Sequence, residues 1–279
     1  MPELPQMQAL AERLDAAVAG SAVEAIDAIG FAALKSLLPD RNRIVGSRVL
    51  KVSRRGKYLV FMFESGSRLL VHLSTAGRVD LENPPRSTRP RGAVLRIELS
   101  NGHAVFVREH GHERRAAWWF LPPGEDGPLA ALGPEPFTEE FAARIGSELS
   151  ARRLHSLLRD QRFVAGIGRG YADDIVHRAG LSPLLPLSSL ASPDRSRVVE
   201  AARSVLTAGL QSERRRTGGL SQARLGTVFT VHGHSGEPCP NCGEVLGKVS
   251  FDSLEITYCR LCQTNGRILK DRRMSRLLR

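Results

Sequence analysis

Apolar and polar positions change their spacing along the chain, and these changes mark its expected elements. Apolar side chains recur every three or four positions over residues 3–18, which predicts an amphipathic helix that Gly20 can end. Further on, short β-branched, aliphatic and aromatic runs alternate with Gly, Pro, Ser or Asn, which is typical of strands joined by turns. The expected strands are 49–53, 58–63, 68–73, 93–99, 103–108 and 116–120.

These elements favour a two-layer antiparallel β-sandwich with the long helix lying along it. A Pro- and Gly-rich stretch at 122–136 indicates a hinge, and residues 138–213 beyond it are largely helical, with breaks at 165–170 and 180–186. The expected fold class is therefore α+β with several domains. We expect an N-terminal β-sandwich domain at 1–125, a hinge at 126–137, a helical domain at 138–230, a cysteine-bearing β-hairpin at 231–264 and a basic tail at 265–279.

The composition indicates a polyanionic partner. The chain of 279 residues has a formal charge of +11, and 35 of its 40 basic residues are arginine, which binds phosphate through a bidentate fork. A basic surface that binds nothing, as an arginine-rich proteome produces, is the alternative. The chain has no apolar stretch of about 18 residues and no signal peptide opens it. We therefore expect a cytoplasmic, nucleoid-associated protein with no membrane partner.

Four cysteines form the strongest motif of the chain, because their spacing indicates a metal site without support from any other motif. Cys239, Cys242, Cys259 and Cys262 make two Cys-x2-Cys pairs, a spacing that suits tetrahedral zinc on two turns of a β-hairpin. Disulfides would not persist inside a cell, and four buried free thiols are the alternative. We expect one structural zinc ion, because four thiolates leave no open position for substrate or water. His232 and His234 exceed that ligand count, and we interpret them as surface residues or phosphate contacts.

The N-terminal sequence offers a nucleophile. Removal of Met1 would leave Pro2 with a secondary amine, and an α-amine is far less basic than a lysine side chain. A proline nitrogen is more basic than other α-amines and needs help from its site. Glu3 beside it is a candidate acid–base group. The alternative is an N-terminal coil that leads into the helix.

Two further features suit phosphate binding. Gly166 and Gly168 precede an expected helix that carries Tyr171, so backbone amides at its start can hold a phosphate oxygen. An ordinary turn between helices is the alternative. Lys57 lies between a glycine turn and a strand, where it can reach a phosphate or a sugar oxygen; a solvated lysine is the alternative.

These motifs follow one another in the order of one family. They are the opening Met-Pro-Glu-Leu-Pro-Gln, Arg-Arg-Gly-Lys-Tyr-Leu at 54–59 with Val-His-Leu-Ser-Thr-Ala-Gly at 71–77, Leu-Gly-Pro-Glu-Pro-Phe at 132–137 with the run at 157–174, and the two cysteine pairs. Over residues 1 to about 264 the chain resembles the formamidopyrimidine-DNA glycosylase and endonuclease VIII family of base-excision repair enzymes.

The resemblance implies a DNA glycosylase with abasic-site lyase activity that acts as a monomer on damaged double-stranded DNA, with single-stranded and bubble DNA left open as substrates. Pro2 would attack C1′ of a flipped-out nucleotide, Glu3 would move protons and Lys57 would assist. It also implies a helix-two-turns-helix element in the helical domain and a zinc finger in the hairpin. The residues that it implies contact DNA are Arg108, His110, His155, Gly168, Arg169 and Tyr171.

The chain departs from the family's pattern in the parts that the family uses to read DNA. Gln6 replaces the second acid of the family's opening motif. Thr75 stands where the family often has a methionine wedge, and Leu254 stands where the zinc hairpin of the family has an arginine. His155 and Arg169 stand where many members have Lys and Asn, and both keep a donor.

Two loops leave alternatives open. The wedge loop is either Arg108-Glu-His-Gly, with His110 as the wedge, or a register centred on Arg114 and Arg115. The segment between Gly219 and Val231 is short for a loop that caps the lesion. A DNA-damage-binding protein with little or no catalysis therefore remains an alternative function. A zinc-ribbon transcription or translation factor would leave the N-terminal motif unexplained.

Overall fold

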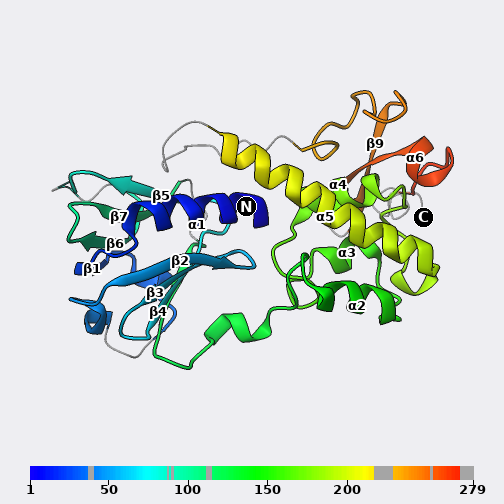
Figure 1. Cartoon of the computed structure of the whole chain (residues 1–279). Helices are drawn as coiled ribbons and strands as arrows, with labels where there is room; N and C mark the ends of the chain where they lie inside the picture. The colour runs from blue at the N-terminus through cyan, green and yellow to red at the C-terminus, as the bar shows by residue number, and fades with distance from the viewer. Residues whose placement is uncertain are drawn as a thin grey trace. The chain divides into compact units, whose positions relative to one another are not determined.

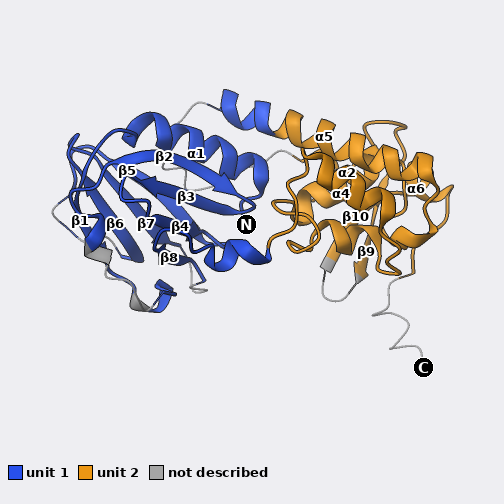
Figure 2. Ribbon diagram, turned by 60° about the horizontal axis from the view of Figure 1, so that its bottom comes forward, with its two compact units in different colours: residues 1–131, 210–226 blue, residues 132–209, 227–279 orange. Residues whose placement is uncertain are grey.

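The computed structural model describes residues 1–36, 41–86, 88, 91–110, 115–216, 229–251 and 254–270, which form two compact units. Unit 1 contains residues 1–131 and 210–226, and unit 2 contains residues 132–209 and 227–279 (Figure 2). The long helix α5 (Ser192–Arg215) therefore belongs to unit 2 up to Gly209 and to unit 1 from Leu210. The finer division into hinge, finger and tail stays a prediction.

Unit 1 consists of the helix α1 (Leu4–Val18) and two four-stranded antiparallel sheets, which confirms the β-sandwich prediction (Figure 1). The first sheet has the order β1 (Val23–Ala28), β6 (Ala93–Leu99), β7 (Ala104–Glu109), β5 (Gly77–Glu82). The second has the order β2 (Val49–Arg55), β3 (Tyr58–Phe63), β4 (Arg68–His72), β8 (Ala117–Leu121). Short 3-10 helices lie at Phe31–Ala33, Arg41–Ile44 and Gly127–Ala131.

The sequence pattern did not predict β1 and β5. The edge strand β5 carries two acidic residues, Asp80 and Glu82, which favour a loop by composition but are buried here. Each carboxylate meets an arginine of the same sheet: Asp80 lies 2.5 Å from Arg108, and Glu82 lies 2.7 Å from Arg96. These distant partners make the strand possible, and no local signal reveals them.

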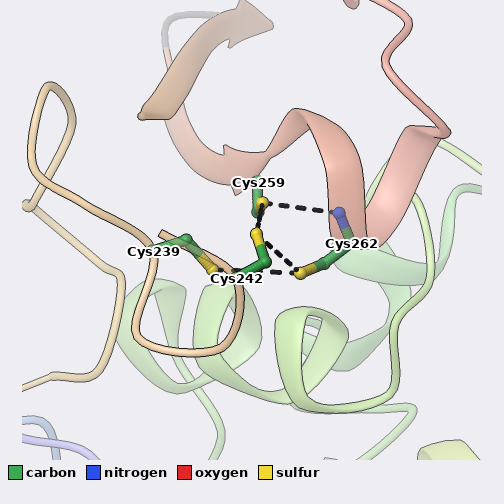
Figure 3. Close-up of side chains that lie close together, drawn as sticks. All are labelled: Cys239, Cys242, Cys259 and Cys262. Carbon is green, nitrogen blue, oxygen red and sulfur yellow. Dashed lines mark hydrogen bonds between the residues drawn. The ribbon is translucent and has the colours of Figure 1, made fainter. Parts of the chain in front are cut away.

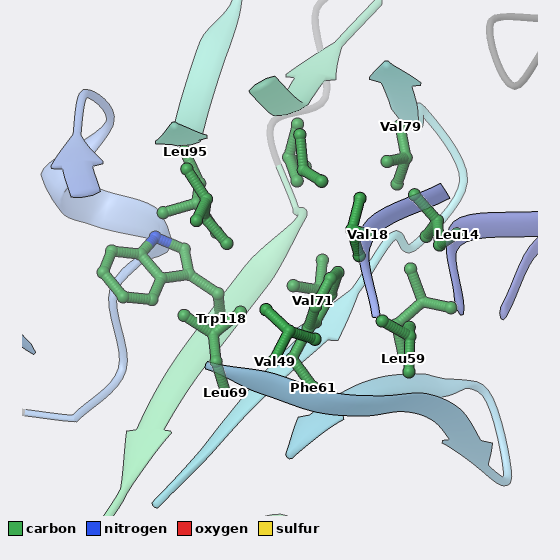
Figure 4. Packing of buried hydrophobic residues seen from close by; sticks show 14 of the residues in the cluster. Leu14, Val18, Val49, Leu59, Phe61, Leu69, Val71, Val79, Leu95 and Trp118 are labelled. Atoms are coloured by element: carbon green, nitrogen blue, oxygen red, sulfur yellow. The ribbon is translucent and has the colours of Figure 1, made fainter. Parts of the chain in front are cut away.

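The core of unit 1 fixes the position of α1. Leu14 and Val18 of α1 pack into the same cluster of buried side chains as Phe61 and Trp118 of one sheet and Leu95 of the other (Figure 4). All five side chains are at most 2% exposed. Because interiors are close-packed, this contact holds the helix and its N-terminal residues against the sandwich.

Unit 2 is helical, with a β-hairpin in its last third. Its elements are α2 (Glu139–Ser147), α3 (Leu154–Leu158), α4 (Arg169–Arg178), a 3-10 turn (Leu187–Ser189), α5 up to Gly209, the hairpin β9 (Leu246–Phe251) and β10 (Leu254–Cys259), and α6 (Arg260–Thr264). Helix α3 ends at Leu158, and just beyond it Asp160 accepts the backbone N–H of Arg162 and pairs with Arg152. Among the described residues, no helix has the length and the apolar composition needed to cross a membrane.

Candidate functional site

Hydrogen bonds at the start of α1 hold the candidate nucleophile in place. Pro2 is buried, and Glu3, 5% exposed, is the N-cap of α1. Glu3 and Gln6 form a capping box: the Glu3 side chain accepts the N–H of Gln6, and the Gln6 side-chain oxygen accepts the N–H of Glu3 at 3.0 Å. The peptide bond between Pro2 and Glu3 is thereby fixed at the end of the helix.

Glu213, near the end of α5, completes this arrangement, and the sequence analysis missed it. The Gln6 side-chain nitrogen donates to the Glu213 carboxylate at 3.3 Å, and Glu213 is 5% exposed. Arg216 lies 3.2 Å from the other carboxylate oxygen. Arg13 of α1 donates to the backbone carbonyls of Glu213 and Arg216 at 2.6 and 3.0 Å. Glu213 lies 207 residues from Gln6, so no local pattern could have paired them.

Lys57 lies in the turn between β2 and β3 and is 5% exposed. Gly56 beside it has a φ of +56°, a conformation that favours glycine. Tyr58 pairs with His72 of β4, and their rings are 4.9 Å apart. Burial lowers the pKa of His72 to about 4, and the charge of Lys57 contributes to the same shift. His72 lies within the motif at 71–77 and received no role from sequence; its position beside Lys57 adds it to the candidate site.

The buried neutral histidine makes stability depend on pH. The folded pKa of His72, about 4, lies below its ordinary 6.5. Between these values the unfolded chain binds a proton at His72 and the folded chain does not. The free energy of unfolding should therefore fall as the pH decreases from 6.5 to 4, by at most about 1.4 kcal/mol per pH unit from this residue. Urea unfolding of the wild type and His72→Gln across this range measures the difference, and parallel curves would contradict the assignment.

The two expected DNA contacts beside the wedge loop, Arg108 and His110, differ in their surroundings. Arg108 belongs to β7, and its guanidinium is paired with Asp80 at 2.5 Å. His110 follows the strand and is exposed, with its backbone N–H donating to Ala76. Glu109 accepts the backbone N–H of Ala116 at 2.6 Å and so joins the two ends of the loop. Residues 111–114 lie outside the described residues, so both registers of the wedge remain predictions.

In unit 2, a glycine turn joins α3 to α4 as the helix-two-turns-helix pattern requires. Gly166 has a φ of +95°, and the Gln161 side chain accepts its N–H and donates to the carbonyl of Ile167. Gly168 is the N-cap of α4, and Arg169 after it is exposed. The start of α4 therefore presents an exposed cation beside helix amides, an arrangement suited to a phosphate.

Tyr171 lies in the first turn of α4 and is buried. It is 3% exposed, and its ring lies 5.1 Å from that of Phe229. A Cβ atom at Gly209 of α5 would lie 2.4 Å from the Tyr171 hydroxyl, so only glycine fits there. Tyr171 therefore packs α4 against α5, and a contact of its side chain with DNA stays a prediction.

His155 does not lie at the surface, which corrects the expectation that its side chain contacts phosphate. It is 1% exposed, and its Nε2 atom lies 2.9 Å from the buried carboxylate of Asp173 in α4. His232 lies 2.6 Å from the other oxygen of Asp173, and the N–H of Thr257 in β10 donates to that oxygen. Burial alone would raise the pKa of Asp173, but the two imidazoles lower it. His155 and His232 therefore brace α3 and the hairpin against α4.

The next residue of α4 binds the chain that leads into the hairpin. The Asp174 carboxylate accepts the backbone N–H groups of Thr230, Val231 and His232 at 2.7, 2.9 and 3.2 Å. Burial nevertheless raises the pKa of Asp174, since it disfavours the charged form. Helix α4 thus has the candidate phosphate site at its N-terminus and, through Asp174, binds the chain that leads into the hairpin.

The four cysteines meet at the base of the hairpin (Figure 3). Their sulfur atoms all lie within 4.8 Å of one another, and three of the separations are 3.4, 3.5 and 3.9 Å. Four sulfurs around a zinc ion at about 2.3 Å are about 3.8 Å apart, so the geometry fits a tetrahedral zinc site. His177 of α4 lies 3.2 Å from the Cys239 sulfur, a contact that sequence did not predict. His234 instead pairs with Glu237.

Comparisons with known proteins agree with this arrangement. The model of the formamidopyrimidine-DNA glycosylase N-terminal domain matches residues 1–113, and that of the formamidopyrimidine-DNA glycosylase H2TH domain matches residues 132–219. The formamidopyrimidine-DNA glycosylase of Pelotomaculum thermopropionicum is 32% identical over 282 residues, covering 94% of this chain and 99% of the relative. That of Thermus thermophilus is 33% identical over 279 residues, covering 95% and 100%.

Solved structures show the same fold. The MutM (Fpg) protein of Thermus thermophilus superposes with a TM-score of 0.79 at 30% identity, covering 94% of this chain and 98% of that one. A Lactococcus lactis Fpg variant bound to a Fapy-dG-containing DNA superposes with a TM-score of 0.81 at 22% identity, covering 94% and 100%, and supports the fold alone. With both domain models matched and relatives similar along nearly their whole length, this chain belongs to the formamidopyrimidine-DNA glycosylase family.

Proposed function

We propose that this protein is a DNA glycosylase of base-excision repair that also cleaves abasic sites, with the Pro2 amine as its nucleophile. The observation that carries the proposal is the fixed, buried Pro2–Glu3 segment at the start of α1, in a chain of this family. Relatives that share 32% and 33% of their residues with it bear the name formamidopyrimidine-DNA glycosylase. The basic composition supports DNA as the partner.

The chemistry follows from an amine beside a carboxyl group. With Met1 removed, the Pro2 lone pair forms a bond to C1′ of the flipped nucleotide while the glycosidic bond breaks, and the base leaves with that electron pair and takes up a proton. Glu3 lies next to the amine and moves protons as the sugar ring opens. The resulting iminium makes the C2′ proton acidic, so its removal expels the 3′ phosphate and nicks the strand.

Lys57 and His72 supply the second part of the site. Lys57 is a buried cation and suits a phosphate or sugar oxygen of the substrate. His72 beside it is neutral at physiological pH, because its pKa lies near 4. It therefore adds no second positive charge and can accept or donate a hydrogen bond.

Unit 2 would bind the DNA backbone. The start of α4, with Gly168 and Arg169, supplies amides and a cation for phosphate. The four cysteines would hold one structural zinc ion, which keeps the hairpin folded and takes no part in the chemistry. Either His110 or the register centred on Arg114 and Arg115 would fill the gap left by the flipped nucleotide.

Borohydride trapping on abasic DNA tests the proposal. Borohydride reduces an imine between enzyme and sugar to a stable amine, so only a protein that forms this intermediate becomes linked to the DNA. We expect a covalent complex with abasic-site duplex and none with intact duplex. A chain that binds abasic DNA without being trapped would instead be a damage-binding protein on the same fold.

A further inference from the structure

Glu213 is a buried acid that the reaction described above does not use. Its side chain is 7% exposed and touches the Gln6 amide nitrogen at 3.3 Å and the Arg216 guanidinium at 3.2 Å. Arg13 of α1 holds the backbone around it by donating to the carbonyls of Glu213 and Arg216. An acid in such a place needs its partners, because burying a charge without them is costly.

The Gln6 amide connects Glu213 to the reactive end of the chain. Its oxygen accepts the Glu3 N–H at 3.0 Å, and its nitrogen donates to Glu213. A carboxylate only accepts hydrogen bonds, so Glu213 determines that the nitrogen of the Gln6 amide, and not its oxygen, faces it. The amide oxygen must then face the Glu3 N–H, which belongs to the peptide bond with Pro2. Gln6 is 3% exposed, so water does not compete for these bonds.

We propose that Glu213 is a positioning residue for the N-terminal proline: acting through Gln6, it holds the Pro2–Glu3 peptide in the orientation the reaction needs. This inference rests on the proposed role of Pro2. It also explains how the chain functions with glutamine at position 6, since the acid that interacts with this position comes from α5. A second carboxylate at position 6 would face Glu213 and repel it.

A neighbouring ion pair provides a matched control. Arg214 of α5 binds Glu12 of α1 at 2.6 Å, one residue away from Glu213 and between the same two helices. Their side chains are 52% and 35% exposed, and the Glu12 carboxylate accepts hydrogen bonds from Arg214 and Gln8. Substitution of either Glu213 or Arg214 should loosen the contact between α1 and α5. Only substitution of Glu213 should also change the position of the N-terminal peptide.

The test combines four variants with two measurements. Glu213→Leu, Gln6→Glu, the double variant Gln6→Glu/Glu213→Gln and Arg214→Gln are compared with the wild type. The first measurement is the single-turnover rate of borohydride trapping at saturating abasic DNA, alongside DNA affinity. The second is hydrogen exchange of the Glu3 amide by NMR, which reports the bond to Gln6 without any reaction.

We expect Glu213→Leu and Gln6→Glu to slow trapping roughly 10- to 100-fold with DNA affinity unchanged, since small misplacements of reacting groups cost this much. Glu3 amide exchange should accelerate in both. The double variant should regain the wild-type trapping rate and the slow exchange of the Glu3 amide, because the new amide at position 213 donates to the new carboxylate at position 6. Arg214→Gln should match the wild type.

Two results would overturn the inference: a folded Glu213→Leu variant with wild-type trapping and exchange, or a double variant no better than Gln6→Glu. If Glu213→Leu does not fold, the comparison of Gln6→Glu with the double variant still decides. If the wild type is not trapped at all, the proposed function fails. Glu3 amide exchange across the same variants then decides separately whether Glu213 holds the N-terminal peptide.

Discussion

A chain carrying one extra residue before Pro2 will lose borohydride trapping on abasic DNA, with DNA affinity retained within about twofold. The added residue converts the Pro2 nitrogen into an amide whose lone pair is delocalised, so it no longer attacks C1′. Retention of Met1 has the same effect. Pro2→Gly and Glu3→Gln should each reduce base excision, and Lys57→Ala should reduce it less completely. The measurement is the trapped fraction on a denaturing gel, with affinity determined separately by titration.

Proteolytic removal of a tag that ends directly before Pro2 provides the matched control, because the same preparation should regain trapping after cleavage. A tagged chain that is trapped at the wild-type rate would show that Pro2 is not the nucleophile. The buried amine of Lys57 would then be the candidate, and Lys57→Ala would abolish trapping altogether.

The second large effect concerns the metal. We expect one zinc ion per chain, and Cys259→Ser should lose both the ion and most of the DNA affinity, by at least about 10-fold. Structural zinc contributes about 10–16 kcal/mol of apparent binding energy to small zinc modules, so the hairpin should not stay folded without it. The hairpin contacts α4 through Asp173, and the chain leading into it contacts α4 through Asp174 and His177. Loss of the zinc ion should therefore loosen the helix that begins at Gly168.

Elemental analysis and DNA titration on the same samples measure this effect. His234→Asn is the control for the zinc content, since His234 lies in the same segment but pairs with Glu237 rather than with a sulfur. The far-ultraviolet signal of the β-sandwich should survive in Cys259→Ser, because no cysteine belongs to unit 1. Freshly purified, unchelated protein without zinc would contradict the assignment of the site.

Local patterns determined much of this protein. The helical spacing of residues 3–18 predicted α1, and runs of β-branched and aromatic residues predicted six of the eight strands of the sandwich. The spacing of the cysteines predicted that their sulfurs meet. These features depend on neighbours in sequence: side-chain periodicity, turn residues and the short reach of a Cys-x2-Cys loop.

Tertiary structure alone decided the features that depend on distant partners. The acids of β5 are buried because Arg96 and Arg108 neutralise them, and His155 lies in the interior because Asp173 does. Gln6 meets Glu213 from the far end of the chain. A charged residue costs free energy in the interior unless a partner lies close. The sequence names these residues and their charges, but only the packing of helices and sheets brings each one to the partner that makes its burial possible.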